Sequence, residues 1–320
     1  MLLCSYRGER YLARQLDSIA AQTLPATLFV HDDASDDGTL DILTQHPLSP
    51  SVVAHADNVG IVRNIERGLR QLHAAGHRHV ALADQDDVWH PRRLEACVRE
   101  MQLLEARLGA HTPLLVHSDL RMIDATGREL APSFVRYRGY ATSASRSVAV
   151  MLGQSGVMGN TCLLNRALIE LAHPFPTGLH VHDWWLGLMA ELYGARGFVN
   201  EALVDYRIHR DNVSNSVGAL DGGAGPPTLG KLLRRDFRVP FMEDGRRQVL
   251  QALLLGDGHR PVPRGADRDT LEDFVACLGL PEARWRSTSR LIRGGFARPG
   301  RRHRLRLVAA ALTTARYDRR

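Results

Sequence analysis

The segment VALADQDDVWHP, residues 80–91, carries three aspartates at the end of an apolar run. The run predicts a buried strand, and Asp84 and Asp86, two positions apart, are expected to project from one face of it. Carboxylates held so close repel each other unless a cation or hydrogen-bond donors lie between them. Mg²⁺ and Mn²⁺ prefer oxygen ligands and commonly combine one or two protein carboxylates with phosphate oxygens. The segment therefore predicts a divalent metal, Mn²⁺ or Mg²⁺, that holds a diphosphate.

A simpler interpretation of these aspartates stays open. Acidic residues often precede a helix, and the next helix is expected to start at Pro91 and Arg92. The carboxylates would then only cap that helix.

A second acidic cluster, HDDASDDGT at residues 31–39, also follows an apolar run. Asp33 is suited to accept a hydrogen bond from the imide N–H of a uracil or thymine base. An N-capped turn into the next helix accounts for Asp36, Asp37 and Thr39 in either case. Two acidic clusters at strand ends favour a ligand site over two unrelated caps.

The elements that must position these residues alternate along the first hundred residues. Apolar runs predict strands at 2–4, 27–33, 51–57 and 79–87, and helical periodicity predicts helices at 9–22, 35–46 and 62–75. This alternation is typical of a parallel α/β sheet, which binds ligands beyond the carboxyl ends of its strands. The first strand has three apolar residues before Ser5, so it is either unusually short or the sequence begins inside it.

The pattern is looser after residue 100. We expect a strand and turn at 114–124, a loop at 131–147, a glycine-rich loop leading into a strand and a helix at 151–172, a helix at 182–194 and a strand at 198–209. Residues 221–228, DGGAGPPT, indicate a linker, and the remainder is helical and rich in arginine.

Composition excludes several protein classes. The 44% hydrophobic fraction over 320 residues argues against a disordered chain. The four cysteines lack the spacing of a zinc site, which indicates reduced cytosolic thiols. Apolar runs fall far short of the roughly 20 residues of a membrane span, and a signal-peptide pattern is lacking.

The net charge of +6 is carried almost wholly by arginine, with twelve arginines against one acid between Arg284 and Arg320. This basic segment suggests a contact with anions. Three interpretations are open, namely a solvated helical face, peripheral contact with an anionic membrane, and nucleic-acid binding. Nucleic acid is disfavoured because the sequence contains no known binding module.

The motifs together resemble the family 2 glycosyltransferases, in particular bacterial rhamnosyltransferase-like members that act on surface polysaccharides. They occur in the order of the family over the first two thirds of the chain, as LCSYRGERYLARQLDSIAAQT, DDASDDGT, DNVGIVRNIERGL, ADQDDVWHP, GNTCLLNR, HDWW and YRIHRDNVS. A single such motif is weak evidence, whereas seven in order are specific.

The resemblance implies a GT-A fold, an α/β architecture with a Rossmann-like nucleotide-binding half and an acceptor half on one mixed, mainly parallel sheet. The implied glycosyltransferase domain spans residues 1–220, with its nucleotide-sugar-binding half at 1–100 and its acceptor half at 101–220. A linker at 221–230 and a helical, basic C-terminal extension at 231–320 follow.

The resemblance also implies roles for residues on the donor side of the site. The nucleoside would lie beside three residues of the first loop, and Asp33 would bind the base. Asp84 would contact the ribose or the metal, and Asp86 would be the principal metal carboxylate. The remaining donor-side residues are Ser5, Tyr6 and Glu9 at the nucleoside and Arg63 and Asn64 along the nucleotide sugar.

On the acceptor side, the resemblance makes Asp183 of HDWW the catalytic base. Gly159, Asn160 and Thr161 would form the floor near the acceptor, and His209 would complete the metal or diphosphate site. The sequence departs from the family pattern at Asn160, where cysteine is frequent, and at Arg7, where asparagine is usual.

Plainer alternatives accompany these roles. Trp184 and Trp185 either stack on an acceptor sugar or belong to the core of an amphipathic helix. Asp183 either caps that helix or acts as the base, and both are compatible. His209 is structural if it is not a ligand, in which case Arg207 and Arg210 meet the diphosphate.

We therefore expect an inverting, metal-dependent glycosyltransferase that uses a dTDP- or UDP-sugar, such as dTDP-rhamnose. Its expected acceptor is a cell-surface glycan or a lipid-linked acceptor, and its expected location is the cytoplasm, peripheral on the cytosolic face of the inner membrane. Two rivals remain, a sugar nucleotidyltransferase and a nucleotide-sugar-binding or scaffold protein without turnover. This sequence lacks the glycine-rich basic loop that a nucleotidyltransferase would need after its first strand.

Overall fold

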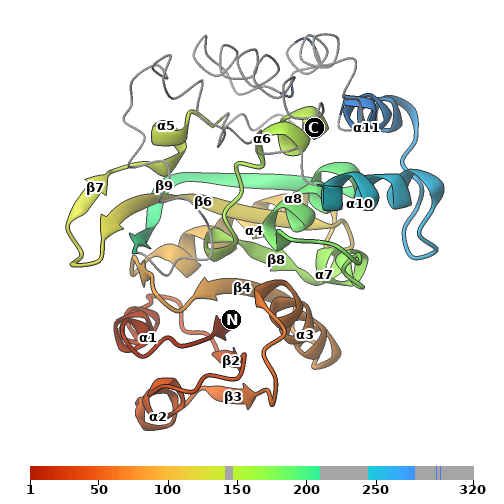
Figure 1. Ribbon diagram of the computed structural model, residues 1–320. Coiled ribbons are helices and arrows are strands. Elements are labelled where there is room, and N and C mark those ends of the chain that lie inside the picture. Colours follow the sequence, from red (N-terminus) through yellow and green to blue (C-terminus); the bar gives the residue numbers. More distant parts are fainter. Residues whose placement is uncertain (141–146, 210–243, 278–292, 294–295, 297–320) are drawn as a thin grey trace, which may run out of the picture. The chain divides into compact units, whose positions relative to one another are not determined.

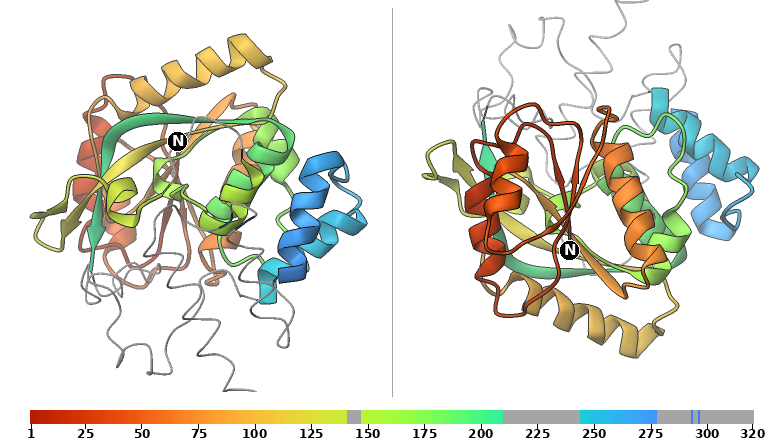
Figure 2. Two further views of the ribbon diagram at one scale, coloured as in Figure 1. Left: turned by 90° about the horizontal axis from the view of Figure 1, so that it is seen from above. Right: turned by 90° about the horizontal axis from the view of Figure 1, so that it is seen from below.

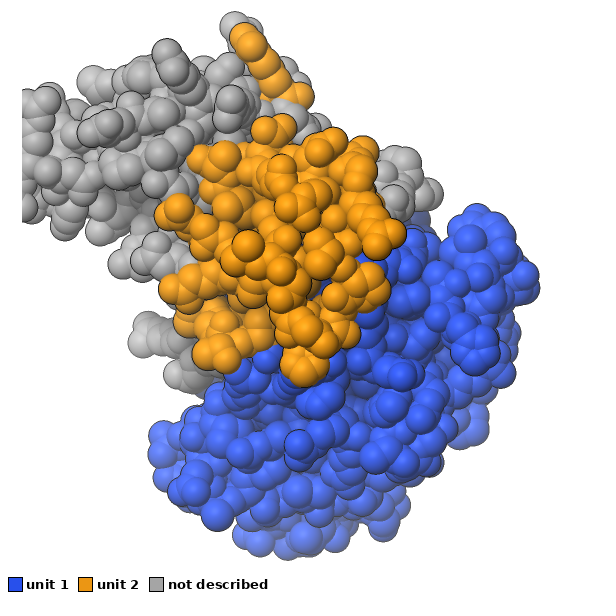
Figure 3. All heavy atoms as spheres, turned by 90° about the vertical axis from the view of Figure 1, so that its right-hand side faces the viewer, with its two compact units in different colours: residues 1–138, 157–175, 181–212 blue, residues 139–156, 176–180, 213–320 orange. Residues whose placement is uncertain are grey.

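The computed structural model describes residues 1–140, 147–209 and 244–277 together with residues 293 and 296. The chain divides into two compact units, coloured in Figure 3. Unit 1 contains residues 1–138, 157–175 and 181–212, and unit 2 contains residues 139–156, 176–180 and 213–320.

Unit 1 is built on one nine-stranded sheet with the order β3-β2-β1-β4-β8-β6-β9-β5, and β7 pairs with β6 at the side (Figure 1). The strands β3, β2, β1 and β4 are parallel, as are β6 and β9, whereas β8 joins β4 and β6 by antiparallel pairing. The strands are Leu2–Ser5 (β1), Phe29–Asp32 (β2), Ser51–Ala54 (β3), His79–Asp84 (β4), Val88–Trp89 (β5), Leu114–Asp124 (β6), Glu129–Ala131 (β7), Leu163–Asn165 (β8) and Ala195–Ile208 (β9). The prediction of one mixed, mainly parallel α/β sheet is confirmed.

Helices cover both faces of this sheet. Figure 2 shows α4 on one face of the β6–β9 region and α7 and α8 on the other. The helices of unit 1 are Leu12–Ala20 (α1), Thr39–Gln45 (α2), Ile61–Ala74 (α3), Arg93–Leu108 (α4), Phe134–Arg138 (α5), Arg166–Ala172 (α7) and His182–Tyr193 (α8), with a 3₁₀ turn at Gly159–Thr161 (η1). Because helices such as α3 and α4 pack buried residues against the sheet, the loops at the strand ends are held in fixed positions.

The carboxyl ends of β1, β2 and β4 meet at one edge of the sheet. Strand β1 is only four residues long, but all four residues are buried and both of its edges are paired. Its register sets Ser5 beside Asp32 and Cys4 beside Asp84. The acidic clusters predicted at two strand ends are thereby brought to a common edge.

The elements of the first hundred residues agree with the sequence predictions to within a few residues, except that the two-residue strand β5 was not predicted. Several later elements were not predicted. Strand β6 continues to Asp124, where a turn was expected, because its second half pairs with both β7 and β9. Helices α5 and Val148–Gln154 (α6) lie in segments expected to be loops, and the Ser147 side chain caps α6 by accepting from Val150 N.

Unit 2 contains α6, Asp244–Leu255 (α10) and Gly265–Cys277 (α11), and α11 packs against α6 and α10. The predicted linker at 221–230 and the predicted boundary at residue 220 lie outside the described residues. Of the basic segment 284–320, the structure describes only residues 293 and 296. Among the helices that the structure describes, none has the length and apolar character to cross a membrane.

Gly68 of α3 packs directly on β1, since a Cβ at this position would lie 2.5 Å from Leu2 Cδ1. We expect Gly68→Ala to destabilise the protein by about 1–2 kcal/mol, because overpacking a buried contact outweighs the gain in helix propensity. Urea unfolding would measure this change. Arg70→Ala, on the exposed face of the same helix, should stay within about 0.5 kcal/mol of the wild type, and equal stability of the two variants would contradict the packing argument.

Candidate active site

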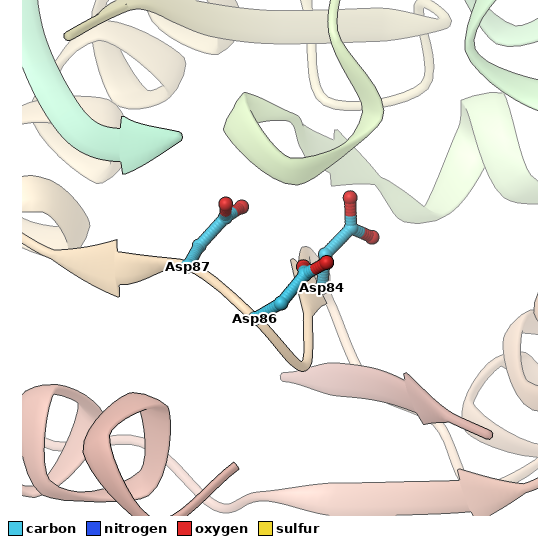
Figure 4. Close-up of side chains that lie close together, drawn as sticks. All are labelled: Asp84, Asp86 and Asp87. Carbon is cyan, nitrogen blue, oxygen red and sulfur yellow. The ribbon is translucent and has the colours of Figure 1, made fainter. Parts of the chain in front are cut away.

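Asp84, Asp86 and Asp87 lie on the segment that joins β4 to β5, and their carboxylates point to the same side of the chain (Figure 4). One oxygen from each carboxylate can be chosen so that all three lie within 4.8 Å of one another. This cluster could hold a metal ion, and it contains Asp84 and Asp86, the two carboxylates predicted to face a metal at the end of the fourth strand. The alternative of a helix cap is not observed, because β5 lies between the aspartates and α4, and α4 has no side-chain cap at its N-cap Arg92.

Asp87 is fully buried and both of its carboxylate oxygens are hydrogen-bonded. Oδ1 accepts from the backbone N–H of Arg207 at 3.2 Å, and Oδ2 accepts from Asn160 Nδ2. Burial and the charges of Asp86 and Asp84 raise the pKa of Asp87 far above its usual value. We call residues 84–87 the acidic loop. Asp87 connects this loop to β9 and η1, and Asp84 and Asp86 are its more accessible carboxylates.

The pKa of Asp84 is raised to about 7 by burial and by the negative charges of Asp86 and Asp183. Arg93 acts in the opposite direction but does not cancel these effects. A cation placed among these carboxylates would remove the repulsion between them. The donor set thus fits a divalent cation with oxygen ligands such as Mg²⁺ or Mn²⁺.

His209 follows β9, and its Nε2 atom lies 2.8 Å from Asp86 Oδ2. The imidazole also packs on Tyr11, with 5.0 Å between the ring centroids. The structure therefore brings His209 to the carboxylate that the sequence analysis selected as the main metal ligand. In this arrangement the imidazole orients Asp86, and its ligation of a metal remains a prediction.

Arg207 supports the acidic loop from within the protein. Its Nε donates to the backbone carbonyl of Asp86 at 2.9 Å, and its guanidinium lies 4.8 Å from the ring centroid of Tyr11. The side chain is only 1% exposed. Arg207 is thus a structural residue of the loop in this structure, not the diphosphate contact considered from the sequence; Arg210 lies outside the described residues.

Arg93 at the start of α4 is a buried cation below the site. Its Nη2 donates to the carbonyls of Leu82 at 3.1 Å and Asn160 at 2.7 Å, and its guanidinium lies 3.5 Å from the ring centroid of Trp89. Burial lowers its pKa to about 10, which leaves it charged at neutral pH. Arg93 therefore supplies positive charge beneath the aspartates and links η1 to β4 through hydrogen bonds.

Asp183 lies in the first turn of α8, and its Oδ2 accepts from the backbone N–H of Gly159 at 3.2 Å. It is not the N-cap, which is Val181. Gly159 has no room for a side chain, because a Cβ would lie 2.4 Å from His182 Nε2. The turn η1 thus links Asp183 to the acidic loop, because Asn160, the residue after Gly159, donates a hydrogen bond to Asp87.

Trp184 and Trp185 are both completely buried. The indole Nε1 of Trp185 donates to the Ala172 carbonyl at 3.0 Å, which ties α8 to the end of α7. Both rings therefore belong to the core, and this geometry does not support stacking of Trp184 on an acceptor sugar. Thr161 is also buried and its hydroxyl donates to the Met158 carbonyl at 2.8 Å, so it shapes η1.

The loop after β1 carries residues that were predicted to lie beside the nucleoside. Tyr6 is 40% exposed, and its backbone N–H and C=O both bond the Gln85 side chain at 2.8 Å. Glu9 accepts from Gly38 N at 3.1 Å, and the hydroxyl of Ser5 donates to Asp32 at 2.7 Å. These bonds fix the loop to the ends of β2 and β4.

Asp33 directly follows β2, and its two carboxylate oxygens accept from Val59 N at 2.9 Å and Gly60 N at 2.8 Å. The side chain is 3% exposed. Asp33 therefore holds the loop that precedes α3. Each oxygen retains a second lone pair, and base recognition by Asp33 remains a prediction.

Arg63 and Asn64, predicted to line the nucleotide sugar, lie in the first turn of α3. Arg63 donates to the carbonyl of Phe175 at 3.2 Å and pairs with Glu66. Asn64 is buried, and its Nδ2 donates to the carbonyl of His31 at 2.9 Å. Asn64 thus anchors α3 to β2, whereas Arg63 is half exposed near the end of α7.

Residues 1–108 match the family model described as glycosyl transferase family 2. The chain carries a glycosyl transferase family 2 domain. The matched residues of this family 2 domain include β1 to β5 and the acidic loop.

Two curated relatives match part of the chain. The dTDP-rhamnosyl transferase RfbG of Shigella flexneri is 28% identical over 102 residues, which is 30% of this chain and 35% of the relative. An uncharacterized glycosyltransferase of Nostoc sp. is 29% identical over 109 residues, which is 32% of each chain. The similarity thus spans about a third of the length of these relatives.

The fold also resembles a solved structure, that of S. aureus TarS in complex with UDP-GlcNAc. The two share 15% identity with a TM-score of 0.56, over 98% of this chain and 87% of the TarS chain. At this identity the likeness concerns the fold. It confirms the predicted GT-A arrangement of the family 2 domain.

Two supporting residues of the family 2 domain, Arg93 and Asp87, were not among the predicted site residues. Arg93 has a signal in the sequence, since it lies on the apolar stripe of α4 with Cys97 and Met101 at helical spacing. A charged residue on such a stripe indicates a buried partner network. Asp87 has no comparable signal, because Asn160 and the Arg207 backbone lie far away in sequence.

The raised pKa of Asp84 predicts a pH-dependent stability of the metal-free protein. The native state keeps a proton on Asp84 up to about pH 7, whereas the unfolded chain loses it near pH 4, so the unfolding free energy falls as pH rises between these values. We expect Asp84→Asn to be stabilised relative to wild type at pH 8 by on the order of 2 kcal/mol more than at pH 5. Urea unfolding in EDTA at both values would measure this difference.

Asp41→Asn, on the exposed surface of α2, is the matched control and should show no such pH-dependent difference. An equal difference between Asp84→Asn and wild type at pH 5 and pH 8 would contradict the assigned repulsion.

Proposed function

We propose that this protein is an inverting, metal-dependent glycosyltransferase that takes a sugar from a pyrimidine nucleotide sugar. One observation carries the proposal. Asp183 accepts a hydrogen bond from the backbone N–H of Gly159, and its negative charge helps to raise the pKa of Asp84 in the acidic loop. A base for the acceptor hydroxyl and acids suited to a metal diphosphate thus belong to one connected site.

In the proposed step, the acceptor hydroxyl oxygen forms a bond to the anomeric carbon of the donor sugar. The hydroxyl proton moves to Asp183, and the bond from the anomeric carbon to the diphosphate oxygen breaks. The electron pair of that bond leaves with the nucleoside diphosphate. Attack from the face opposite the leaving group inverts the anomeric configuration.

Different residues of the chain contribute to different parts of this step. A divalent cation bound by Asp84 and Asp86 would offset the negative charge that develops on the departing diphosphate. His209 and Arg207 keep Asp86 in place through its carboxylate and its backbone carbonyl, respectively. Burial around Gly159 and Trp184 limits water near Asp183, which strengthens electrostatic interactions there.

For the donor, we propose a dTDP- or UDP-sugar, with Asp33 at the base and Tyr6 beside the nucleoside. The names of RfbG and of the TarS complex, which mention dTDP-rhamnosyl transfer and UDP-GlcNAc, support this class. For the acceptor, we propose a surface glycan or a lipid-linked precursor, reached from the cytosolic face of the inner membrane.

Asp183→Asn tests the proposed base. An asparagine keeps an oxygen that can accept the Gly159 N–H, so the fold should be retained, but it cannot take the proton. We expect kcat to fall by about 10²–10⁴-fold, the usual contribution of a general base, while donor binding is unchanged. Release of nucleoside diphosphate from dTDP-rhamnose or UDP-sugars, with a panel of glycan acceptors, would measure kcat.

Asp41→Asn, which removes an exposed carboxylate from α2, should keep full activity. Full activity of Asp183→Asn would remove the mechanism. Pyrophosphate as the product would identify a nucleotidyltransferase instead, and donor binding without turnover over the whole acceptor panel would identify a binding protein.

Asp86→Ala tests the metal and the donor together. We expect dTDP- or UDP-sugars to raise the melting temperature of the wild type by several degrees only when Mn²⁺ or Mg²⁺ is present, because a ligand stabilises the folded state that binds it. The shift should disappear in Asp86→Ala. An identical shift without metal, or a larger shift with GDP-sugars, would contradict the proposed donor site.

A further inference from the structure

A hollow of about 620 Å³ lies in unit 1 between α3 and the strands β2 and β3. None of the predicted site residues lines it. Its polar lining consists of His31 from β2, His55 directly after β3, and Arg67, Arg70 and Gln71 from α3. We call it the α3 hollow.

Regular secondary structure explains why these side chains meet. Arg67, Arg70 and Gln71 are spaced by three and four residues, so they share one face of α3. His55 is fixed by its backbone N–H, which donates to the Asp32 carbonyl at 2.9 Å. The two histidine rings lie close, with 5.3 Å between their centroids.

A chain of polar contacts runs through the hollow. Arg67 Nη1 lies 3.5 Å from His55 Nδ1, His55 Nε2 lies 3.2 Å from His31 Nδ1, and His31 Nε2 lies 2.7 Å from Gln71 Oε1. If Gln71 accepts from His31 Nε2, then His31 Nδ1 accepts from His55 and His55 Nδ1 faces the guanidinium of Arg67. All donors of this chain of contacts then point the same way, from Arg67 toward Gln71.

The lining combines two arginines and two histidines with no acidic residue. Neither Arg67 nor Arg70 forms an ion pair with a carboxylate in the part of the chain that the structure describes. Burial, His55 and Arg67 together lower the pKa of His31, although Gln71 acts against them. Positive charge is therefore gathered here without a counter-charge in the lining.

We propose that the α3 hollow binds a phosphate group, as a second ligand site beside the donor site. Arginine guanidiniums recognise phosphate oxygens through paired, charge-assisted hydrogen bonds, and two of them match a dianion with several oxygens. The phosphate group belongs either to a soluble phosphate ester or to a phospholipid headgroup. The proposal does not depend on the transferase activity.

The test uses the full chain in metal-free buffer with inorganic phosphate as the probe. The melting temperature should rise with phosphate relative to chloride at equal ionic strength. Arg67→Gln/Arg70→Gln should weaken the apparent affinity by about tenfold or more, since both guanidinium contacts are lost. Both arginines are exposed, so this variant should fold.

Arg14→Gln/Arg99→Gln is the matched control, because it removes the same charge from two exposed positions outside the hollow. It should bind phosphate like the wild type. Equal phosphate affinity of the Arg67/Arg70 variant and the wild type would overturn the proposal. So would competition between phosphate and a nucleotide sugar, which would assign the phosphate to the donor site.

A second pair of probes separates the two sources of the phosphate group. Glycerol phosphate stands for a soluble ester, and phosphatidylcholine vesicles with or without phosphatidylglycerol stand for a membrane. Loss of vesicle binding in the Arg67/Arg70 variant would indicate the headgroup. Binding of glycerol phosphate with unchanged vesicle binding in this variant would indicate the soluble ester, and no effect of the variant on either probe would overturn the proposal.

Discussion

The repulsion among Asp84, Asp86 and Asp87 is the constraint on which the candidate site depends. Three carboxylates on four consecutive residues, one of them fully buried, would separate or become protonated without neighbouring donors. The structure offsets this cost with one group nearby in the sequence and one far from it. Arg93 lies beneath the loop, and Arg207 bonds its backbone from β9.

These supporting contacts also connect the two halves of unit 1. Arg93 on α4 bonds carbonyls of both β4 and η1, and Asn160 of η1 bonds Asp87. The next link is the N–H of Gly159, which holds Asp183. Asp183, the proposed base, and the aspartates of the proposed donor side are thereby positioned by a short series of hydrogen bonds instead of two independent loops.

The parallel strands β1, β2 and β4 set the position of the predicted nucleotide side of the site. The registers of β1, β2 and β4 bring Ser5, Asp32 and Asp84 to one edge, where the loops that follow can hydrogen-bond each other. Helix α3 borders both the candidate site and the α3 hollow. Its first turn is anchored to β2 through Asn64, and its exposed face borders the basic α3 hollow.

The amino-acid sequence is sufficient to predict the α/β alternation, the acidic clusters at the ends of β2 and β4, and the motif order that indicates family 2. These features are local, since strand and helix periodicity and the residues after each strand are set by short segments. The surroundings of each side chain depend on the tertiary structure. Asp87 is buried and hydrogen-bonded to Asn160, Trp184 lies in the core, and Arg93 is a buried cation packed on Trp89. The backbone N–H of Arg207 that bonds Asp87 lies 120 positions away in the sequence, so no local pattern could specify the surroundings of Asp87.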